Sequence, residues 1–360
     1  MKIVVVGAGY AGTIAANRAA RKVKGAEVTV INPREEFVER VRLHERVAGG
    51  GGAATPLSAM LRDGVRVRLG TVERIGDGEV TLQDGEVSGF DYLFLAVGST
   101  VRAPEGTIPV GTWEGAEQGR AALAGLPDGS PVTVVGGGLT GIETAAEVAS
   151  ARPDLRVSLV SPTLGDSLAE GGRRRVRKGL ERLNVEVVQD TFAGLDPETG
   201  AVLLASGGRI ASGLTLWAIL EGVPDLAARS GLKVDGEGRA IVDETLRSVS
   251  DQRIFVVGDC AAVPGARAAC ATALPQGAHA ADTLARVLTG RRPAPYSMGY
   301  AGQAISLGRR DAVIQTTRRD DSPRGLHLAG RAAAVAKETI VRYARTGART
   351  AVYGWLRGPK

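Results

Sequence analysis

The sequence has few cysteines and no long hydrophobic run. Its 360 residues include only Cys260 and Cys270, which are too few for a disulfide framework and lack the spacing of a zinc or thioredoxin-type site. No apolar segment approaches the ~18 residues that cross a bilayer. Met1 leads directly into a strand pattern, without the basic and apolar regions of a signal peptide. We therefore expect a cytoplasmic protein without structural disulfides.

Histidine is equally scarce. None of the three histidines, His44, His279 and His327, has a second potential ligand at a metal-binding spacing, so we expect no metal site. Hydrophobic residues make up 44% of the chain and charged residues 23%, values typical of folded soluble proteins. The length favours two or three domains.

Glycine, in contrast, is abundant, and it is prominent in two similar segments. Residues 4–20 read VVVGAGYAGTIAANRAA and residues 134–150 read VVGGGLTGIETAAEVAS. Each segment joins a strand pattern to an alanine-rich helical pattern, and a second strand pattern follows, AEVTVINP or RVSLVSP. A glycine turn before a helix lets a pyrophosphate approach free N–H groups and the positive end of the helix dipole. Two such units therefore predict two dinucleotide sites.

Further strand patterns lie between and after these units. They read VRVRLGTVERI, GEVTLQDG, DYLFLAVGS, VEVVQDT, AVLLAS and RIFVVGD. Several alternate polar and apolar residues, which is typical of antiparallel ribbons. We therefore expect an α/β fold with two Rossmann-like domains, an inserted antiparallel sheet and a small C-terminal segment.

Four segments together resemble a known family, the two-dinucleotide-binding flavoproteins that include the pyridine nucleotide-disulfide oxidoreductases. They are GAGYAG, LFLAVGS, GGGLTGIE, and IFVVGDCAAV with the following LPQGAHAADTLARVL. The resemblance is to the branch of type II NADH dehydrogenases and apoptosis-inducing-factor-like oxidoreductases. It implies an FAD-binding domain at residues 1–110 and 225–290, an NAD(P)H-binding domain at 111–224 and a C-terminal interface segment at 291–360.

The resemblance also implies roles for individual residues. Those expected at FAD are Gly7, Gly9, Gly12, Asn32, Arg42, His44, Gly98 and Asp259. Those expected at NADH or NADPH are Gly136, Gly138, Gly141 and Glu143. Two alternatives stay open, because an aspartate after a strand is often a helix N-cap and residues 37–50 also read as a basic amphipathic helix.

The chain departs from the usual dinucleotide pattern at both strand ends. Asn32 and Ser161 stand where Asp or Glu usually accepts hydrogen bonds from ribose hydroxyls. Asn32 can still bind a ribose. Ser161 removes a carboxylate that would repel the 2′-phosphate of NADPH, and four arginines follow it, Arg173, Arg174, Arg175 and Arg177. NADH, NADPH and a weakened second site all remain open.

The electron acceptor is constrained by the absence of early cysteines. Disulfide reductases of this family carry a CxxxxC pair near a glycine turn, and no cysteine precedes Cys260. Sulfide:quinone reductases need separate cysteines flanking the flavin, and Cys270 has no earlier partner suited to that role. A quinone, a protein carrier, oxygen or a small organic molecule remains as the acceptor.

The last part of the chain is basic and amphipathic. Residues 318–360 contain ten basic and three acidic residues, so the rest of the chain is nearly neutral. One helical stripe there would carry Ala336, Ile340, Tyr343 and Ala344. Such a helix suits a membrane interface, and it equally suits docking on its own domain or on a second subunit in a homodimer. Nucleic-acid binding is a weaker expectation.

We expect an FAD-dependent NAD(P)H oxidoreductase that passes a hydride to the flavin and electrons to a quinone-like or other small acceptor. Lys337 in the C-terminal segment is the candidate catalytic residue, placed over the flavin. One alternative is a biosynthetic tailoring flavoenzyme that uses oxygen or a small-molecule substrate. Another is a redox-sensing or interaction protein that responds to NAD(P)H.

Overall fold

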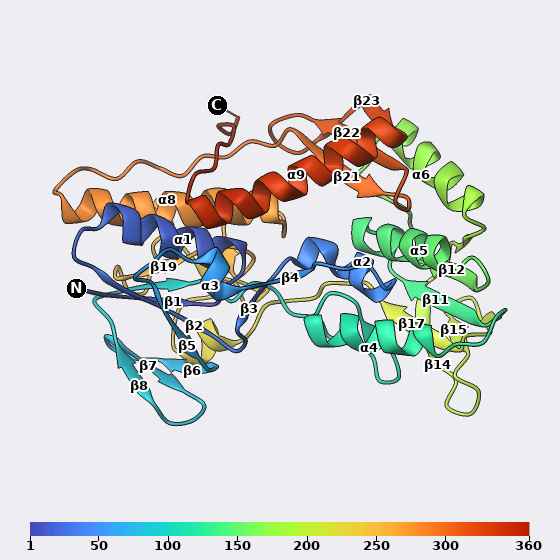
Figure 1. Ribbon diagram of the computed structural model, residues 1–360, viewed down its shortest axis with the longest axis horizontal. Helices are drawn as coiled ribbons and strands as arrows, with labels where there is room; N and C mark the ends of the chain where they lie inside the picture. Colours follow the sequence, from blue (N-terminus) through green and yellow to red (C-terminus); the bar gives the residue numbers. More distant parts are fainter. Residues whose placement is uncertain (360) are drawn as a thin grey trace.

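The computed structural model describes residues 1–359 and arranges them in two lobes along the longest axis of the molecule (Figure 1). Each lobe contains a five-stranded sheet in which neighbouring strands are all parallel. Strands of parallel sheets are buried on both faces, so they are continuous apolar runs. The expected α/β class with two Rossmann-like domains is confirmed.

The first lobe combines strands that lie far apart in the sequence. Its sheet has the order β19-β9-β1-β2-β5. The sheet and its two helices are β1 (Lys2–Val6), α1 (Tyr10–Lys22), β2 (Glu27–Asn32), β5 (Arg66–Leu69), β9 (Tyr92–Leu95), β19 (Ile254–Val256) and α8 (Cys270–Leu288). Phe94 and Phe255 stack between β9 and β19, with ring centroids 5.1 Å apart. Gly277 lets α8 approach α1, because a Cβ there would lie 2.3 Å from the carbonyl oxygen of Ala11.

The second lobe repeats this arrangement with its own sheet, of order β10-β17-β11-β12-β13. Its elements are β10 (Ile108–Pro109), α4 (Trp113–Ala124), β11 (Pro131–Val135), α5 (Leu139–Ala151), β12 (Arg156–Val160), α6 (Glu170–Arg182), β13 (Glu186–Val188) and β17 (Leu214–Trp217). Thr112 caps α4, since its hydroxyl accepts a hydrogen bond from the backbone N–H of Gly115. The short strand β10 joins this sheet immediately after the chain leaves the first lobe.

Each lobe also carries a small antiparallel sheet. These are β6 (Val72–Ile75), β7 (Glu79–Leu82) and β8 (Val87–Gly89) in the first lobe, and β14 (Phe192–Leu195), β15 (Val202–Leu204) and β16 (Arg209–Ile210) in the second. The sequence predicted one strand over residues 65–75, and that prediction is wrong. The chain turns at Gly70, whose φ is +157°, so β5 joins the parallel sheet and β6 joins the antiparallel one.

Residues 36–60 reach from the first lobe to the second. They form β3 (Glu36–Val38), the 3-10 turn η1 (Arg40–Arg42), α2 (Leu43–Val47), β4 (Ala54–Pro56) and α3 (Leu57–Met60). Helix α2 packs against α4 and α5, and its buried Leu43 and Val47 belong to the core of the second lobe. The remaining short elements are α7 (Leu226–Arg229), β18 (Ala240–Ile241) and β20 (Ala261–Ala262).

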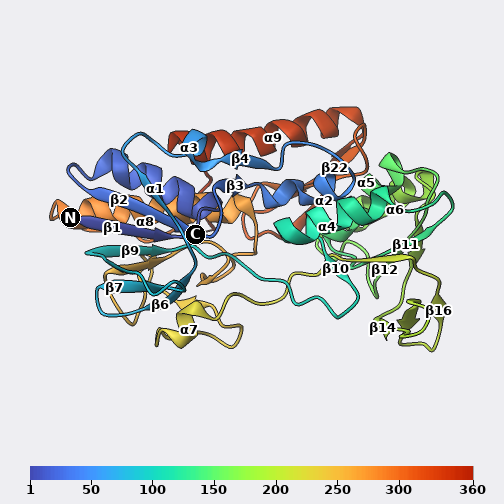
Figure 2. The same cartoon turned by 60° about the horizontal axis from the view of Figure 1, so that its bottom comes forward.

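The C-terminal segment spans both lobes. Its sheet, β21 (Gly302–Ser306), β22 (Ala312–Thr317) and β23 (Pro323–Ala329), packs on α5 and α6 of the second lobe. The last helix, α9 (Arg331–Thr350), starts there and ends beside α1 and α8 of the first lobe (Figure 2). No helix within residues 1–359 is long and apolar enough to cross a membrane.

The apolar stripe that the sequence suggested on α9 is only partly buried. Ala333, Val341, Ala344 and Ala348 are buried, whereas Ile340 is 51% exposed. The buried residues recur at spacings of three and four, with one gap in the row at residue 337. That gap is filled by a lysine that forms a buried ion pair, described below.

Asn17 on α1 fixes the C-terminal end of α9. The side chain is fully buried, and its Nδ2 atom donates to the carbonyl oxygens of Met60 and Ala348, both at 2.9 Å. Its Oδ1 atom accepts from the backbone N–H of Arg62 at 2.8 Å. The amide therefore joins α9 to α1 and to the end of α3.

Replacing Asn17 by alanine leaves these buried backbone groups without partners. We expect Asn17→Ala to lower the free energy of unfolding by about 3 kcal/mol, measured by urea denaturation. The control is Lys24→Ala in the exposed turn after α1, which removes no hydrogen bond described in the structure. Equal unfolding midpoints for the two variants would contradict this role of Asn17.

Candidate active site

The first glycine turn joins β1 to α1 and is closed on its inner side. Gly7 has a φ of +97°, and a Cβ there would lie 2.5 Å from the carbonyl oxygen of Ala96. A Cβ on Gly12 would lie 1.9 Å from the carbonyl oxygen of Gly7. A Cβ on Gly9, in contrast, would meet no atom within 4 Å. The backbone of the turn is thus closely packed at Gly7 and Gly12, whereas the space at Gly9, in front of the N-terminus of α1, is open.

The second turn, between β11 and α5, has the same construction. Gly136 has a φ of +123°, a Cβ on Gly141 would lie 1.8 Å from the Gly136 carbonyl oxygen, and Gly138 faces open space. Neither α1 nor α5 has a side-chain N-cap or an acidic residue in its first turn. Their terminal N–H groups therefore remain available to an anion such as a pyrophosphate.

Asn32 ends β2 next to the first turn. Its Oδ1 atom accepts from the backbone N–H of Ala8 at 3.0 Å, and its Nδ2 atom donates to the carbonyl oxygen of Arg34 at 2.8 Å. The Asn32 side chain therefore stabilises the conformation of the glycine turn through Ala8. A contact with a ribose would be a second role of the same side chain.

Asp259 follows β19 and faces residues that follow β9. Gly98 has a φ of +70°, and the next residue, Ser99, donates its hydroxyl to Asp259 Oδ2 at 2.7 Å. Arg40 Nη1 lies 4.0 Å from the same oxygen and donates to the carbonyl oxygen of Ser99 at 3.1 Å. Arg40 and Ser99 were not among the predicted site residues. In the case of Arg40, nothing in segment 37–50 distinguishes it from its basic neighbours.

A cavity of about 220 Å³ adjoins Asp259. Its polar lining consists of Ser99, Glu237, Arg239, Asp259, Arg267, Thr272 and Gln276. Leu220 and Val223 add an apolar wall. The Gln276 side chain accepts from the backbone N–H of Gly258 at 2.7 Å, which fixes its orientation beside the Asp259 turn.

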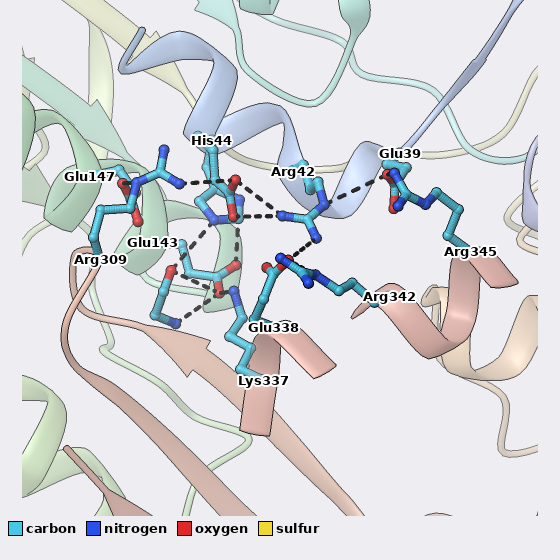
Figure 3. A network of polar contacts seen from close by, with 12 residues as sticks. Glu39, Arg42, His44, Glu143, Glu147, Arg309, Lys337, Glu338, Arg342 and Arg345 are labelled. Atoms are coloured by element: carbon cyan, nitrogen blue, oxygen red, sulfur yellow. Dashed lines mark hydrogen bonds and ion pairs between the residues drawn. The ribbon is translucent and has the colours of Figure 1, made fainter. Parts of the chain in front are cut away.

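Glu143, Lys337 and His44 meet where the two lobes and α9 come together (Figure 3). They come from α5, α9 and α2 respectively. Lys337 Nζ lies 2.6 Å from Glu143 Oε1, and His44 Nδ1 lies 3.8 Å from Glu143 Oε2. The backbone N–H of Ser306 donates to Glu143 Oε1 at 2.9 Å. Three residues assigned separately to NAD(P)H, to FAD and to catalysis thus form one buried cluster.

Burial and neighbouring charges set the protonation of this cluster. Burial lowers the pKa of His44 to about 4, although Glu143 acts in the opposite direction. Burial acts to raise the pKa of Glu143, but Lys337, His44 and the Ser306 N–H more than offset it, so this pKa lies below its ordinary value. At neutral pH the cluster therefore contains a carboxylate and a neutral imidazole.

Arg42 lies beside the cluster and contacts three carboxylates. It is 2.9 Å from Glu338 on α9, 3.3 Å from Glu45 and 3.7 Å from Glu39 (Figure 3). Glu39 is fully buried and accepts a hydrogen bond from the hydroxyl of Tyr10, in the first turn, at 3.1 Å. The Arg42 side chain thus connects the first lobe to α9.

Two further arginines extend this network. Arg345 on α9 lies 3.5 Å from Glu39, and Arg309, between β21 and β22, lies 3.0 Å from the buried Glu147 of α5. Every carboxylate that faces this junction is therefore paired with a cation from another element of the chain.

Both cysteines are held in the thiol form. Burial raises the pKa of Cys260 to about 12 and that of Cys270 to about 11. Neither side chain is therefore a thiolate nucleophile at neutral pH.

Comparison with known proteins gives matches across nearly the whole chain. Residues 1–282 match the family of pyridine nucleotide-disulphide oxidoreductases. An NADH dehydrogenase-like protein of Mycobacterium tuberculosis is 32% identical over 295 residues, which cover 72% of this chain and 73% of that protein. Human ferroptosis suppressor protein 1 is 26% identical over 335 residues, which cover 88% of each chain.

Solved structures share the fold at lower identity. The sulfide:quinone oxidoreductase of Aquifex aeolicus superposes with a TM-score of 0.80 at 19% identity, covering 97% of this chain and 92% of that one. NDH2 of Plasmodium falciparum, solved with NADH, gives a TM-score of 0.76 at 15% identity, covering 98% and 99%.

The buried His44 makes stability depend on pH. Its pKa is about 4 in the folded protein and ordinarily 6.5, so between these values the unfolded chain binds a proton that the folded chain does not. Stability therefore falls as the pH falls from about 6.5 to about 4. Glu143, whose pKa is lowered, adds a loss in the same direction at the acidic end.

We expect His44→Gln to reduce this acid-induced loss of stability by roughly 2–3 kcal/mol. The measurement is urea denaturation at a series of pH values. His327→Gln, on β23, serves as the matched control. A pH dependence in His44→Gln identical to that of the unmodified protein would show that His44 does not titrate as a buried group.

Proposed function

The chain belongs to the pyridine nucleotide-disulphide oxidoreductase family, and we propose that it passes electrons from NADH or NADPH through FAD to a small quinone-like acceptor. Family membership confirms the expected FAD-dependent NAD(P)H oxidoreductase and its two cofactors. The observation that carries the proposal is the position of the buried Glu143–Lys337–His44 cluster at the junction of two lobes that each present an open glycine turn.

The first turn suits FAD. Gly9 leaves space in front of the uncapped N-terminus of α1, where N–H groups can donate to a pyrophosphate. We assign the pyrophosphate to Gly7, Gly9 and Gly12, and we place the ribityl chain near Asp259 and Gly98. Bound FAD supplies the hydride-accepting chemistry, and the protein supplies binding, orientation and charge.

The second turn suits the nicotinamide nucleotide. Gly136, Gly138 and Gly141 present the open N-terminus of α5 to its pyrophosphate. Glu143 lies one helical turn further along α5, so it faces the lobe junction. A nucleotide held at this turn is thereby directed towards the cluster that Glu143 shares with Lys337.

Lys337 is proposed to hold a proton beside the flavin. Its side chain is only 13% exposed, and Nζ lies 2.6 Å from the Glu143 carboxylate. NAD(P)H brings a hydride, so reduction of a quinone needs one further proton, and we propose that Nζ supplies it at the flavin rather than in the acceptor cavity. Neutral His44, whose Nε2 atom lies 3.4 Å from Ser306 Oγ, completes the wall of the cluster without adding charge.

The cavity beside Asp259 is proposed to admit the acceptor next to the flavin, whose ribityl chain we place at Asp259 itself. A quinone ring needs apolar surfaces and donors for its two carbonyl oxygens. Leu220 and Val223 supply apolar surface, and Arg267 and Gln276 supply donor groups. Quinone acceptors are also named for one of the matching structures, the sulfide:quinone oxidoreductase of Aquifex aeolicus.

A peripheral contact with membranes is proposed for the outer surface of β23 and α9. Leu326, Leu328, Val335, Ile340 and Tyr343 are between 48% and 71% exposed on these two neighbouring elements. Exposed arginines on α9 accompany them: Arg331, Arg342 and Arg349. Apolar side chains with flanking basic charge suit an anionic lipid surface, from which a hydrophobic quinone would be drawn.

The proposed reaction is tested by anaerobic spectroscopy of the protein reconstituted with FAD. We expect NADH or NADPH to bleach the flavin absorbance and a short-chain quinone to restore it. Lys337→Met should lower quinone turnover about a hundredfold while FAD stays bound. Arg349→Met, on the exposed face of the same helix, should turn over normally.

Two results would contradict this proposal. Flavin that stays oxidised with both nucleotides excludes the donor reaction, and flavin that is reduced but not reoxidised by quinones excludes the acceptor. Lys337→Arg keeps the charge next to Glu143, so its partial activity separates loss of the proton donor from loss of folding.

Membrane contact is tested by flotation with vesicles of phosphatidylcholine, with and without phosphatidylglycerol. We expect binding only to the anionic vesicles, and we expect salt to weaken it. The double variant Val335→Ser/Ile340→Ser should bind at least about tenfold more weakly. Val87→Ser, which removes an exposed valine from β8, is the control. Salt-insensitive flotation, or equal flotation of both variants, would refute the contact.

A further inference from the structure

The end of β12 lies directly against the second glycine turn. A Cβ on Gly137 would be 2.6 Å from Ser161 Oγ and 1.9 Å from the carbonyl oxygen of Thr163. NADPH differs from NADH only by a phosphate on the adenosine 2′ oxygen, and nucleotide sites of this fold read that position at the end of this strand. The residues around Ser161 therefore decide which nucleotide the turn accepts.

The loop after β12 presents little negative charge. Ser161 takes the place of the carboxylate that would accept from the ribose hydroxyls and repel a phosphate. The one carboxylate in residues 161–169 is Asp166, and it accepts a hydrogen bond from the hydroxyl of Thr163 at 2.6 Å. Asp166 forms no ion pair with α6 within the described residues 1–359, so the arginines of that helix are not neutralised by this loop.

Three of the four arginines near the start of α6 have acceptors elsewhere. Arg174 contacts Glu170, Arg175 lies 2.5 Å from Asp311, and Arg177 donates to the side chain of Gln189 at 3.2 Å. These contacts hold the side chains along the helix or towards β13 and the C-terminal sheet.

Arg173 differs from them in both position and pairing. It is exposed, and across residues 1–359 its guanidinium has no hydrogen-bond or ion-pair partner. Its Cγ atom would lie 3.7 Å from a Cβ on Gly165, and the backbone N–H of Gly165 donates to the carbonyl oxygen of Gly137 at 2.8 Å. The Arg173 side chain, whose guanidinium has no partner within residues 1–359, thus starts beside the loop that contacts the second turn.

From this geometry we infer that Arg173 binds the 2′-phosphate of NADPH and makes NADPH the preferred electron donor. The inference rests on the proposed function, because it assigns the second turn to the nicotinamide nucleotide. A guanidinium suits a phosphate because it donates two parallel, charge-assisted hydrogen bonds. With serine at position 161, NADH lacks the carboxylate that would favour its free 2′-hydroxyl.

The test compares the two nucleotides in matched variants reconstituted with FAD. Stopped-flow reduction of the flavin gives an apparent Kd for each nucleotide. We expect Arg173→Gln to raise the value for NADPH at least about tenfold and to leave that for NADH unchanged. Arg174→Gln, one residue further along α6, should change neither. Ser161→Asp should reverse the preference in favour of NADH.

A second readout needs no turnover. Calorimetric titration with adenosine 2′,5′-bisphosphate and with ADP measures the phosphate contact directly, and only the former should lose affinity in Arg173→Gln. Equal affinities of the unmodified protein for NADPH and NADH, or equal losses in Arg173→Gln and Arg174→Gln, would overturn the inference. Flavin that neither nucleotide reduces would contradict the proposed function, and the calorimetry would still decide the role of Arg173.

Discussion

The ion pair between Glu143 and Lys337 is the interaction on which the arrangement of the molecule depends. A carboxylate buried at a lobe junction is costly unless a cation compensates it. Glu143 belongs to the second lobe, and its cation is carried by α9, whose far end is packed into the first lobe. The pair thus fixes the first half of α9 on the second lobe, while Asn17 and the buried alanines hold its far end on the first.

Other buried carboxylates near this junction are also compensated by cations. Arg42 and Arg345 both pair with the buried Glu39, and Arg309 pairs with the buried Glu147. The Arg345–Glu39 and Arg309–Glu147 pairs join segments that are distant in the sequence, and removing a cation would leave a buried carboxylate with fewer partners. The site is thus built from several segments that these pairs hold together.

The sequence was sufficient for the fold class and for the two glycine turns. Those features depend on local chemistry, such as the positive φ of Gly7 and Gly136, and on β-branched runs. The cluster at the junction could be predicted only as separate residues. Glu143, His44 and Lys337 were each expected near a cofactor, but nothing local in the sequence states that they touch.

The inner face of α9 shows the same limit. A pattern of apolar residues places no lysine on a buried stripe, so it does not reveal the stripe that contains residue 337. In the structure the buried ion pair makes that lysine part of the inner face, with Val341 and Ala344 next to it. The burial of a charged residue depends on a partner elsewhere in the chain, and periodicity carries no information about such partners.

The position of Lys337 also imposes an order on synthesis. Both glycine turns leave the ribosome long before α9, so the two parallel sheets can form while Glu143 still lacks its cation. The nascent chain then contains both glycine turns but lacks Lys337, which pairs with Glu143 at the lobe junction. On the role proposed for Lys337, redox chemistry begins only when the last helix has joined the two lobes.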